Sequence, residues 1–256
     1  MGTAVETTLD GAVFTITLID EANRNALSSA LVTEFHTALD LAEADEAVRV
    51  VVVTNTGSVF CAGASLSERT TDDPAPLEAD PARLFARILR SPKPFVGKIA
   101  GHAVAGGTGL AASMDISVAI EDARFGFTEV RLGLAPAIIS VICLPKMRRA
   151  DAGDAFLRGR QFDAREAARL GLINQAVPAD DLDERIGEIV ADLLLGGPKA
   201  LAAAKHILRR VPAMDVDEAM SEMAQLSAEL FGSEEGQAGM SAYLAKRPAP
   251  WAPASD

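Results

Sequence analysis

The sequence predicts an α/β fold in which strand and helix units fill roughly the first 145 residues and helices fill the rest. Three observations support this prediction. Apolar runs of strand length alternate with helical patterns up to Pro145. Two of the buried runs lead into glycine-bearing turns. From about Ala150 onward, apolar residues recur at helical spacing.

The chain begins with a predicted hairpin. Apolar and polar residues alternate from Ala4 to Ile19 on both sides of Asp10-Gly11, a dipeptide that favours a tight turn between two strands. A polar loop over 20–27 then leads to a helix that starts at about Ser28. The residues expected on the inward face of this helix are Leu31, Phe35, Leu39 and Ala42.

The next predicted elements are a strand, a turn, a loop and a helix. Arg49 to Thr54 reads as a buried strand and runs into a glycine-bearing turn over 57–66. Asp and Pro are frequent from Thr70 to Pro81, which predicts a surface loop that is either an insertion or a lid. Ala82 to Arg90 is expected to be helical. Its inward residues would be Leu84, Phe85, Ile88 and Leu89.

The stretch from Lys93 to Asp115 is the centre of the predicted organisation. Phe95 to Ala100 reads as a buried strand, and Leu110 to Met114 suits the start of a helix. Glycines at 101, 106, 107 and 109 permit tight turns and close backbone approach between them. Such a unit presents backbone N–H groups and the positive end of a helix to a negative group.

A nucleotide pyrophosphate is one candidate for that negative group, because residues 107–112 fit the pattern G-x-G-x-x-A. The acidic residue that holds a ribose should then lie about 20 residues further on. Glu121 follows Gly107 by only 14 residues. The spacing therefore favours the other candidate, an oxyanion that forms during a reaction.

Strands and turns continue to Pro145, and helices follow. Ile116 to Ile120 is the next strand, followed by a turn-rich stretch over 124–133 and an apolar segment through Pro145. The helices expected in the second half are Asp163 to Leu170, Asp181 to Leu195, Pro198 to Arg210 and Asp215 to Leu230.

Composition limits the classes of partner. The 256 residues carry a net charge of −12, which argues against nucleic acid or an anionic membrane surface as a bulk partner. The two cysteines, Cys61 and Cys143, form neither a disulfide framework nor a metal-ligand spacing. No targeting or membrane-spanning pattern is present, so we expect a cytoplasmic protein without a metal.

Several motifs occur in an order that resembles the enoyl-CoA hydratase/isomerase, or crotonase, family. They are Asn25-Ala-Leu27, Phe60 to Ala64, Lys93-Pro94, Gly101 to Gly107, Asp115-Ile116, Phe125 to Glu129, Leu132-Gly133, Leu157 to Asp163, Ala167 to Val177 and the tail from Glu235 to Trp251. The resemblance implies a crotonase-like spiral of ββα units over residues 1–195. It implies a helical region over 196–256 for oligomerisation and for capping coenzyme A, in trimers or hexamers. The substrate would be an acyl-CoA thioester, with no cofactor beyond the coenzyme A of that substrate.

The same resemblance implies the catalytic groups. The backbone N–H groups of Ala64 and Gly106 would polarise the thioester carbonyl, and Glu129 would transfer protons. Hydratases of the family place two glutamates around the water, but Gly109 stands in register with the first of them. Ser65 likewise replaces a residue that is usually acidic. The chain therefore carries one of the two acids.

Substrate-binding residues also follow from the resemblance. Arg24, Ala26 and Leu66 match positions that meet the phosphates and adenine of coenzyme A, and Lys246 resembles a cationic end that reaches a nucleotide, often from a neighbouring subunit. Ala62, Gly107 and Ser140 are further candidates. We expect the acyl pocket to be walled by residues 70–90, Phe127 and residues 137–143.

Four functions remain open at this point. In the preferred one, Glu129 orients water and supplies the proton in hydration of a 2-enoyl-CoA, helped by a hydroxyl such as Ser140 or Thr108. The similarity extends to a branch that acts on branched or carboxylated enoyl-CoAs, such as methylglutaconyl-CoA hydratases. Alternatively, Glu129 shuttles a proton between C2 and C4 of a 3-enoyl-CoA as an isomerase. A non-catalytic acyl-CoA-binding oligomer is a third possibility.

A hydrolase is the fourth. It would recruit His102, Ser140 and Asp115, although the sequence has no G-x-S-x-G nucleophile elbow. The preferred interpretation of His102 is a packing residue.

Overall fold

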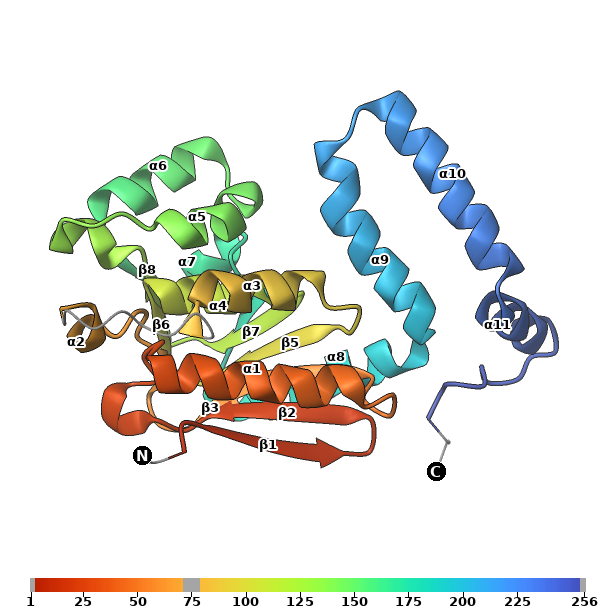
Figure 1. The fold of residues 1–256 in the computed structure, drawn as a ribbon, viewed down its shortest axis with the longest axis horizontal. Helices are drawn as coiled ribbons and strands as arrows, with labels where there is room; N and C mark the ends of the chain where they lie inside the picture. Colours follow the sequence, from red (N-terminus) through yellow and green to blue (C-terminus); the bar gives the residue numbers. More distant parts are fainter. Residues whose placement is uncertain (1–2, 71–78, 254–256) are drawn as a thin grey trace.

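The computed structural model describes residues 3–70 and 79–253 and has an α/β architecture built on two sheets (Figure 1). In the described residues, the larger sheet has six strands in the order β1-β2-β3-β5-β7-β10, and the smaller has four in the order β4-β6-β8-β9. The strands of the larger sheet are β1 (Val5–Asp10), β2 (Val13–Leu18), β3 (Val50–Asn55), β5 (Phe95–Ile99), β7 (Ile116–Ile120) and β10 (Gln175–Val177). Those of the smaller sheet are β4 (Val59–Cys61), β6 (His102–Val104), β8 (Arg124–Gly126) and β9 (Gln161–Asp163).

Successive repeats add one strand to each sheet. The pairs β3 and β4, β5 and β6, and β7 and β8 each place their first strand in the larger sheet and their second in the smaller. Neighbouring strands from different repeats run parallel in both sheets. Helices α3 (Pro81–Arg90) and α4 (Gly106–Ser113) connect one repeat to the next. Both sheets thus grow in step along the chain, which confirms the predicted spiral of ββα units.

The N-terminal predictions are confirmed. Strands β1 and β2 pair antiparallel, and Gly11 in their turn has a φ of +54°, which glycine adopts without steric cost. Helix α1 (Ser29–Ala44) begins after Ser28, whose hydroxyl accepts a hydrogen bond from the Leu31 amide. Its four predicted inward residues are all buried. The surface loop expected at Thr70 to Pro81 falls mostly on residues 71–78, which lie outside the described residues.

Two parts of the prediction are wrong. Helix α4 starts at Gly106 rather than Leu110, because the glycines form its first turn instead of preceding it. The region after Ala150 is not purely helical, since it contains β9, antiparallel to β8, and β10, parallel to β7. Each of these strands has only three residues, too few to produce a period-two pattern.

Short helices complete the second half of the core. Two of them, over 137–143 and 149–158, were not predicted. The helices of this region are α5 (Ala137–Cys143), α6 (Arg149–Arg158) and α7 (Ala164–Arg169), and the 3-10 helix η3 (Thr128–Leu132) precedes them. Helix α8 (Leu182–Leu195) covers the far face of the larger sheet, where Leu182, Ile186 and Ile189 join a buried cluster with valines of β3, β5 and β7. The central strands β3, β5 and β7 are therefore buried on both faces of the larger sheet.

The last three long helices lie apart from the two-sheet body (Figure 1). They are α9 (Pro198–Arg210), α10 (Val216–Gly232) and α11 (Glu234–Leu244). Lys205 of α9 connects them to the body, because its ammonium lies 2.6 Å from Asp115 Oδ2 and 2.7 Å from the Lys93 carbonyl oxygen. Apolar side chains are exposed on these helices, including Leu208, Met220 and Phe231. No helix in the described part of the chain is long and apolar enough to cross a bilayer.

Candidate active site

Three predicted catalytic residues follow three neighbouring strands. Ala64 comes three residues after β4, Gly106 two after β6 and Glu129 three after β8. Because β4, β6 and β8 are adjacent and parallel, their carboxyl ends meet at one edge of the smaller sheet. This edge is where open α/β sheets usually bind ligands. The topology thus brings the three residues together.

The two candidate donor amides lie side by side on touching turns. A Cβ built on Gly106 would lie 3.2 Å from Gly63 Cα and 3.6 Å from the Ala64 nitrogen. The residue before each donor has a positive φ, +89° at Gly63 and +51° at Ala105. Such values are strained for alanine and cluster at functional sites. An unusual backbone conformation therefore orients both amides.

The loop before α1 supports the first of these turns. The Leu27 amide donates to the Gly63 carbonyl oxygen at 2.7 Å, and the Ala62 amide donates to the Arg24 carbonyl oxygen at 3.1 Å. Asn25, fully buried, donates its side-chain amide to the Val59 carbonyl oxygen at 2.7 Å. The Asn25-Ala-Leu27 motif thus holds the chain that carries Ala64.

A cavity of about 430 Å³ opens at this edge of the smaller sheet. Most of its walls are apolar, and Glu129 is the one ionisable side chain among its described lining residues. The lining residues are Leu27, Ala62, Ala64, Leu66, Pro81, Phe85, Ala105, Gly106, Thr128, Glu129, Leu132, Leu134, Ala135, Pro136, Ala137, Ile138 and Ile139.

Glu129 is half-buried in this wall. Its Oε2 atom is buried and has no hydrogen-bond partner among the described residues. Burial in apolar surroundings raises the pKa of the Glu129 carboxyl above its ordinary value, because the charged form loses hydration. A carboxylate with a free oxygen and a raised pKa is suited to accept and release protons near neutral pH.

Aromatic packing fixes the backbone that carries Glu129. Phe127 is fully buried, and its ring centroid lies 4.1 Å from that of Phe156 and 6.5 Å from that of Phe162. Gly159, which ends α6, lies against Val130, because a Cβ on Gly159 would come within 2.7 Å of Val130 Cγ2. Helix α6 therefore packs directly behind η3.

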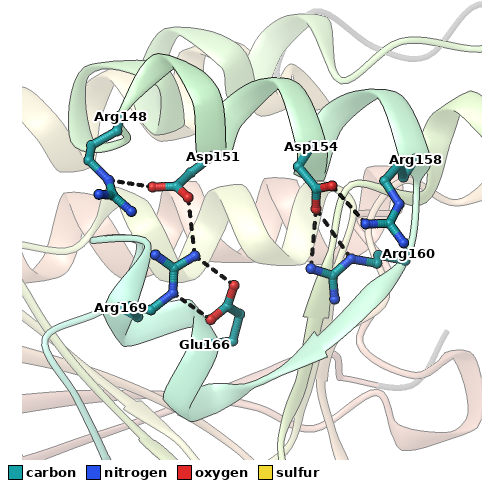
Figure 2. Close-up of polar contacts among 7 residues, drawn as sticks. All are labelled: Arg148, Asp151, Asp154, Arg158, Arg160, Glu166 and Arg169. Atoms are coloured by element: carbon teal, nitrogen blue, oxygen red, sulfur yellow. Dashed lines mark hydrogen bonds and ion pairs between the residues drawn. The ribbon is translucent and has the colours of Figure 1, made fainter.

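Ion pairs hold α6 to its neighbours (Figure 2). Asp151 accepts hydrogen bonds from Arg148 at 2.6 Å and from Arg169 of α7 at 3.1 Å, and Arg169 also pairs with Glu166. Asp154 pairs separately with Arg158 and Arg160 at the other end of α6. The guanidiniums of Arg148 and Arg169 hold the pKa of Asp151 below its ordinary value.

The position of the absent second glutamate is filled. A Cβ built on Gly109 would lie 2.1 Å from Ile139 Cγ2, so α4 and α5 are in direct contact at this point. Ile139 is only 3% exposed and belongs to the cavity wall. An apolar side chain from α5 thus occupies the space beside Gly109.

The predicted substrate-binding residues separate into two groups. Ala62 and Leu66 line the cavity. Arg24 and Ala26 lie in the loop before α1, whose backbone is hydrogen-bonded to residues 62 and 63 beside the cavity. Gly107, Ser140 and Lys246 are not among the described lining residues. Gly107 packs against β4, where a Cβ would lie 1.9 Å from the Cys61 carbonyl oxygen. Lys246 follows α11, which lies on the opposite side of the molecule from α2 (Leu66–Arg69) (Figure 1).

Some of the residues predicted as acyl walls line this cavity. Phe85 and residues 137–139 line the cavity, but Phe127 belongs to the core behind it. Sequence reasoning missed Leu27 and the wall from Leu132 to Pro136. The sequence could have indicated this wall, because the apolar residues Leu132 and Leu134 lie three and five residues after Glu129 in a turn-rich stretch.

The hydroxyls suggested as helpers are engaged elsewhere. Thr108 is buried and donates to the Ala103 carbonyl oxygen at 2.7 Å, and Ser140 donates to the Ala137 carbonyl oxygen at 2.6 Å. The three residues of the hydrolase hypothesis also have other partners. Exposed His102 accepts from the Arg124 amide, so it is not a packing residue, and Asp115 pairs with Lys205. In the described part of the chain, no group of three or more His, Cys, Asp or Glu residues could hold a metal ion.

Comparison with known proteins identifies the family. The model of the enoyl-CoA hydratase/isomerase family matches residues 8–254. The chain is 32% identical to the 2,3-dehydroadipyl-CoA hydratase of Escherichia coli K12, over 92% of this chain and 93% of that protein. It is 31% identical to the enoyl-CoA hydratase EchA19 of Mycobacterium tuberculosis, over 93% and 92%.

Solved structures agree. The crystal structure of a Mycobacterium smegmatis enoyl-CoA hydratase superposes with a TM-score of 0.90 at 30% identity, covering 97% of this chain and 98% of that one. Pseudomonas aeruginosa AtuE also superposes with a TM-score of 0.90 at 30% identity, covering 98% of this chain and all of that chain (100%). The chain belongs to the enoyl-CoA hydratase/isomerase family.

Proposed function

We propose that the protein is an enoyl-CoA hydratase that adds water to a 2-enoyl-CoA thioester with one glutamate. The observation that carries this proposal is the convergence of Ala64, Gly106 and Glu129 on one cavity. The amides of Ala64 and Gly106 would donate to the thioester oxygen, where negative charge develops in the transition state. Such a donor contributes roughly 3–4 kcal/mol to catalysis.

Glu129 would then carry out both proton transfers. As the water oxygen bonds to C3, the Glu129 carboxylate takes one proton from that water, and the C2–C3 double bond electrons move into an enolate held by the two amides. Protonated Glu129 returns the proton to C2, which restores the thioester carbonyl. Burial supports this double role, because it raises the pKa of Glu129 towards the working pH.

The contact between Gly109 and Ile139 supports a mechanism with a single carboxylate. A side chain at position 109 would have to displace Ile139, whose Cγ2 lies 2.1 Å from the site of a Cβ. The hydroxyls of Thr108 and Ser140 each donate to a backbone carbonyl oxygen. Glu129 is therefore the acid–base group that we assign to the reaction.

An isomerase is the second candidate. Transfer of a proton between C2 and C4 of a 3-enoyl-CoA needs one base and no water. The composition of the cavity favours this candidate, because Glu129 is the one ionisable group among its described lining residues. The same amides would hold the dienolate that forms between the two proton transfers.

Product analysis in ¹⁸O-labelled water separates the two reactions. The purified protein is incubated with 2-enoyl- and 3-enoyl-CoAs, and the products are read by mass spectrometry. Incorporation of ¹⁸O into a 3-hydroxyacyl-CoA supports the hydratase. Conversion of 3-enoyl-CoA to unlabelled 2-enoyl-CoA supports the isomerase, and binding of acyl-CoA without turnover would support the non-catalytic oligomer.

Assembly and location are part of the same proposal. We infer a homotrimer or a dimer of trimers formed through residues 196–256, whose helices expose Met220, Phe231 and Tyr243. In such an assembly, Lys246 would reach the nucleotide of coenzyme A bound to a neighbouring subunit. Cys61 and Cys143 are buried free thiols, which suits a cytoplasmic enzyme. No cofactor other than the coenzyme A of the substrate is proposed.

A further inference from the structure

The part of the cavity beyond the reacting groups is lined by hydrocarbon. Its apolar lining residues are Leu27, Phe85, Leu132, Leu134, Ile138 and Ile139. Leu134 and Ile138 are 56% and 46% exposed, so they form the outer part of this wall. An acyl chain that enters here exchanges water for apolar side chains along its length, which favours hydrocarbon.

The described lining residues of this cavity include no cation that could pair with a second negative charge. No Lys or Arg belongs to the described lining residues, and Glu129 already places one carboxyl group in the wall. Burying a carboxylate without a cation or hydrogen-bond donors is costly, and two carboxylates in one apolar site repel each other. A dicarboxylic acyl chain would therefore lose more hydration than the site could replace.

We propose that this site selects enoyl-CoAs whose acyl group is apolar to its end and rejects those that end in a second carboxylate. Leu134 and Ile138 are the specificity-determining residues, because they are apolar wall positions at which a cation could be accommodated without disturbing the core. This inference rests on the proposed acyl-CoA function. It makes branched hydrocarbon chains acceptable and carboxylated ones poor substrates.

Two six-carbon substrates test the inference. We expect kcat/KM for trans-2-hexenoyl-CoA to exceed that for 2,3-dehydroadipyl-CoA by at least about 100-fold, since an apolar pocket discriminates against an added hydroxyl by about that much and an unpaired charge costs more to bury. The ω-methyl ester of 2,3-dehydroadipyl-CoA is the matched control, because it keeps the length of the acid without its charge. Its kcat/KM should recover to within about 10-fold of hexenoyl-CoA. Equal turnover of acid and ester would overturn the inference.

A charge introduced in the wall supplies the second test. Leu134→Arg and Ile138→Arg each offer a guanidinium to the ω-carboxylate, and at least one should shift the ratio of the two kcat/KM values by 10-fold or more towards the acid. Leu157→Arg is the control, because Leu157 is 80% exposed on α6 and is not a lining residue. It should leave the ratio unchanged. A failure of both wall variants to shift the ratio would contradict the assignment of these residues.

The outcomes also separate this inference from the proposed function. If neither six-carbon substrate is hydrated or isomerised, the proposed function fails. If both react and the acid is equal or better, the proposed function stands and the inference on specificity is wrong.

Discussion

A methyl group on Gly63 would lie 2.9 Å from the backbone nitrogen of Gly106. Gly63, which precedes the candidate donor Ala64, therefore packs directly against the amide of the other candidate donor, Gly106. A glycine is required at position 63 for two reasons, since its φ of +89° is also unfavourable for other residues. The spacing of the two amides depends on this absent side chain.

Replacement of Gly63 by alanine should thus impair catalysis. We expect Gly63→Ala to push the Gly106 amide out of place and lower kcat/KM by about 10²–10³-fold, the usual loss for one oxyanion donor. Stability should also fall, by about 1–2 kcal/mol from the positive φ alone. Steady-state kinetics and urea unfolding measure the two effects.

Gly11→Ala is the matched control for backbone strain. Gly11 has a φ of +54°, but no other atom lies within 4 Å of a Cβ built there, and the residue belongs to the β1–β2 turn. This variant should lose a similar 1–2 kcal/mol of stability, about the cost of a left-handed alanine, with kcat/KM unchanged. If Gly63→Ala behaved in the same way, the contact with Gly106 would have no catalytic role.

Glu129→Gln should separate activity from stability. Removing the acid–base group is expected to lower kcat by about 10²–10⁴-fold while acyl-CoA binding persists. Glu129 has a raised pKa in the folded state. At pH values between the ordinary pKa and this raised pKa, the folded state therefore binds more protons than the unfolded state. Its charge therefore lowers the free energy of unfolding as pH rises through that interval, and the variant should be more stable than the wild type at neutral pH.

Thermal unfolding from pH 4 to pH 8 tests this sign. The stability advantage of Glu129→Gln should grow with pH and then level off. Glu6→Gln, at an exposed position on β1, should leave kcat unchanged. Undiminished turnover by Glu129→Gln would remove Glu129 from the mechanism.

Regular local patterns made much of the fold predictable from sequence. The Asp10-Gly11 turn, the start of α1 near Ser28 and the inward face of α1 are decided by residues close together in the chain, and all three are confirmed. Strands β9 and β10 could not be predicted in this way. Their existence depends on partners 37 and 57 residues away, as the pairings Phe125 with Phe162 and Val118 with Gln175 require.

The catalytic residues were assigned from the family resemblance, and local sequence features accompany that assignment. Glycines near Ala64 and Gly106 mark turns that expose amides, and Glu129 follows a strand. The contribution of Ile139 could not be predicted, because it depends on how α5 packs against α4. Tertiary packing also determined that Gly107 supports β4 and that Phe127 lies behind the cavity instead of lining it.

The contact between α4 and α5 gives a further prediction. Gly109→Ala should lower the free energy of unfolding by about 1–3 kcal/mol through overpacking against Ile139, and Ile139→Ala should lower it by about 2–5 kcal/mol through a cavity. The double variant should lose less than the sum of the two. Urea unfolding of the four proteins in this cycle measures the coupling.

Gly187→Ala is the control for a glycine in a helix. A Cβ on Gly187 of α8 has no atom within 4 Å, so this variant should gain about 0.5–1 kcal/mol from helix propensity. Strict additivity of Gly109→Ala and Ile139→Ala would mean that Ile139 does not occupy the space beside Gly109.

The ion pair between Asp151 of α6 and Arg169 of α7 should make α7 sensitive to acid (Figure 2). Arg148 and Arg169 lower the pKa of Asp151 in the folded state, so the unfolded state binds more protons in the interval below the ordinary value of about 3.9. The stabilisation by this carboxylate is present at pH values above its ordinary pKa and is lost as the pH falls through its lowered pKa. Asp151→Asn should therefore be less stable than the wild type at pH 7, and the difference should shrink as pH approaches 3.

Hydrogen exchange can assign this effect to one contact. Asp151 connects α6 to Arg169 of α7, whereas Asp154 pairs with Arg158 and Arg160 at the far end of α6. Asp151→Asn should raise amide exchange over 164–170 at pH 7, and Asp154→Asn should leave that peptide protected. Because α6 packs behind η3, loosening at Asp151 should also lower kcat, by less than 10-fold since Glu129 itself is retained. Equal exchange in both variants would mean that α7 is held by its apolar contacts and that the ion pairs contribute only to the surface of α6.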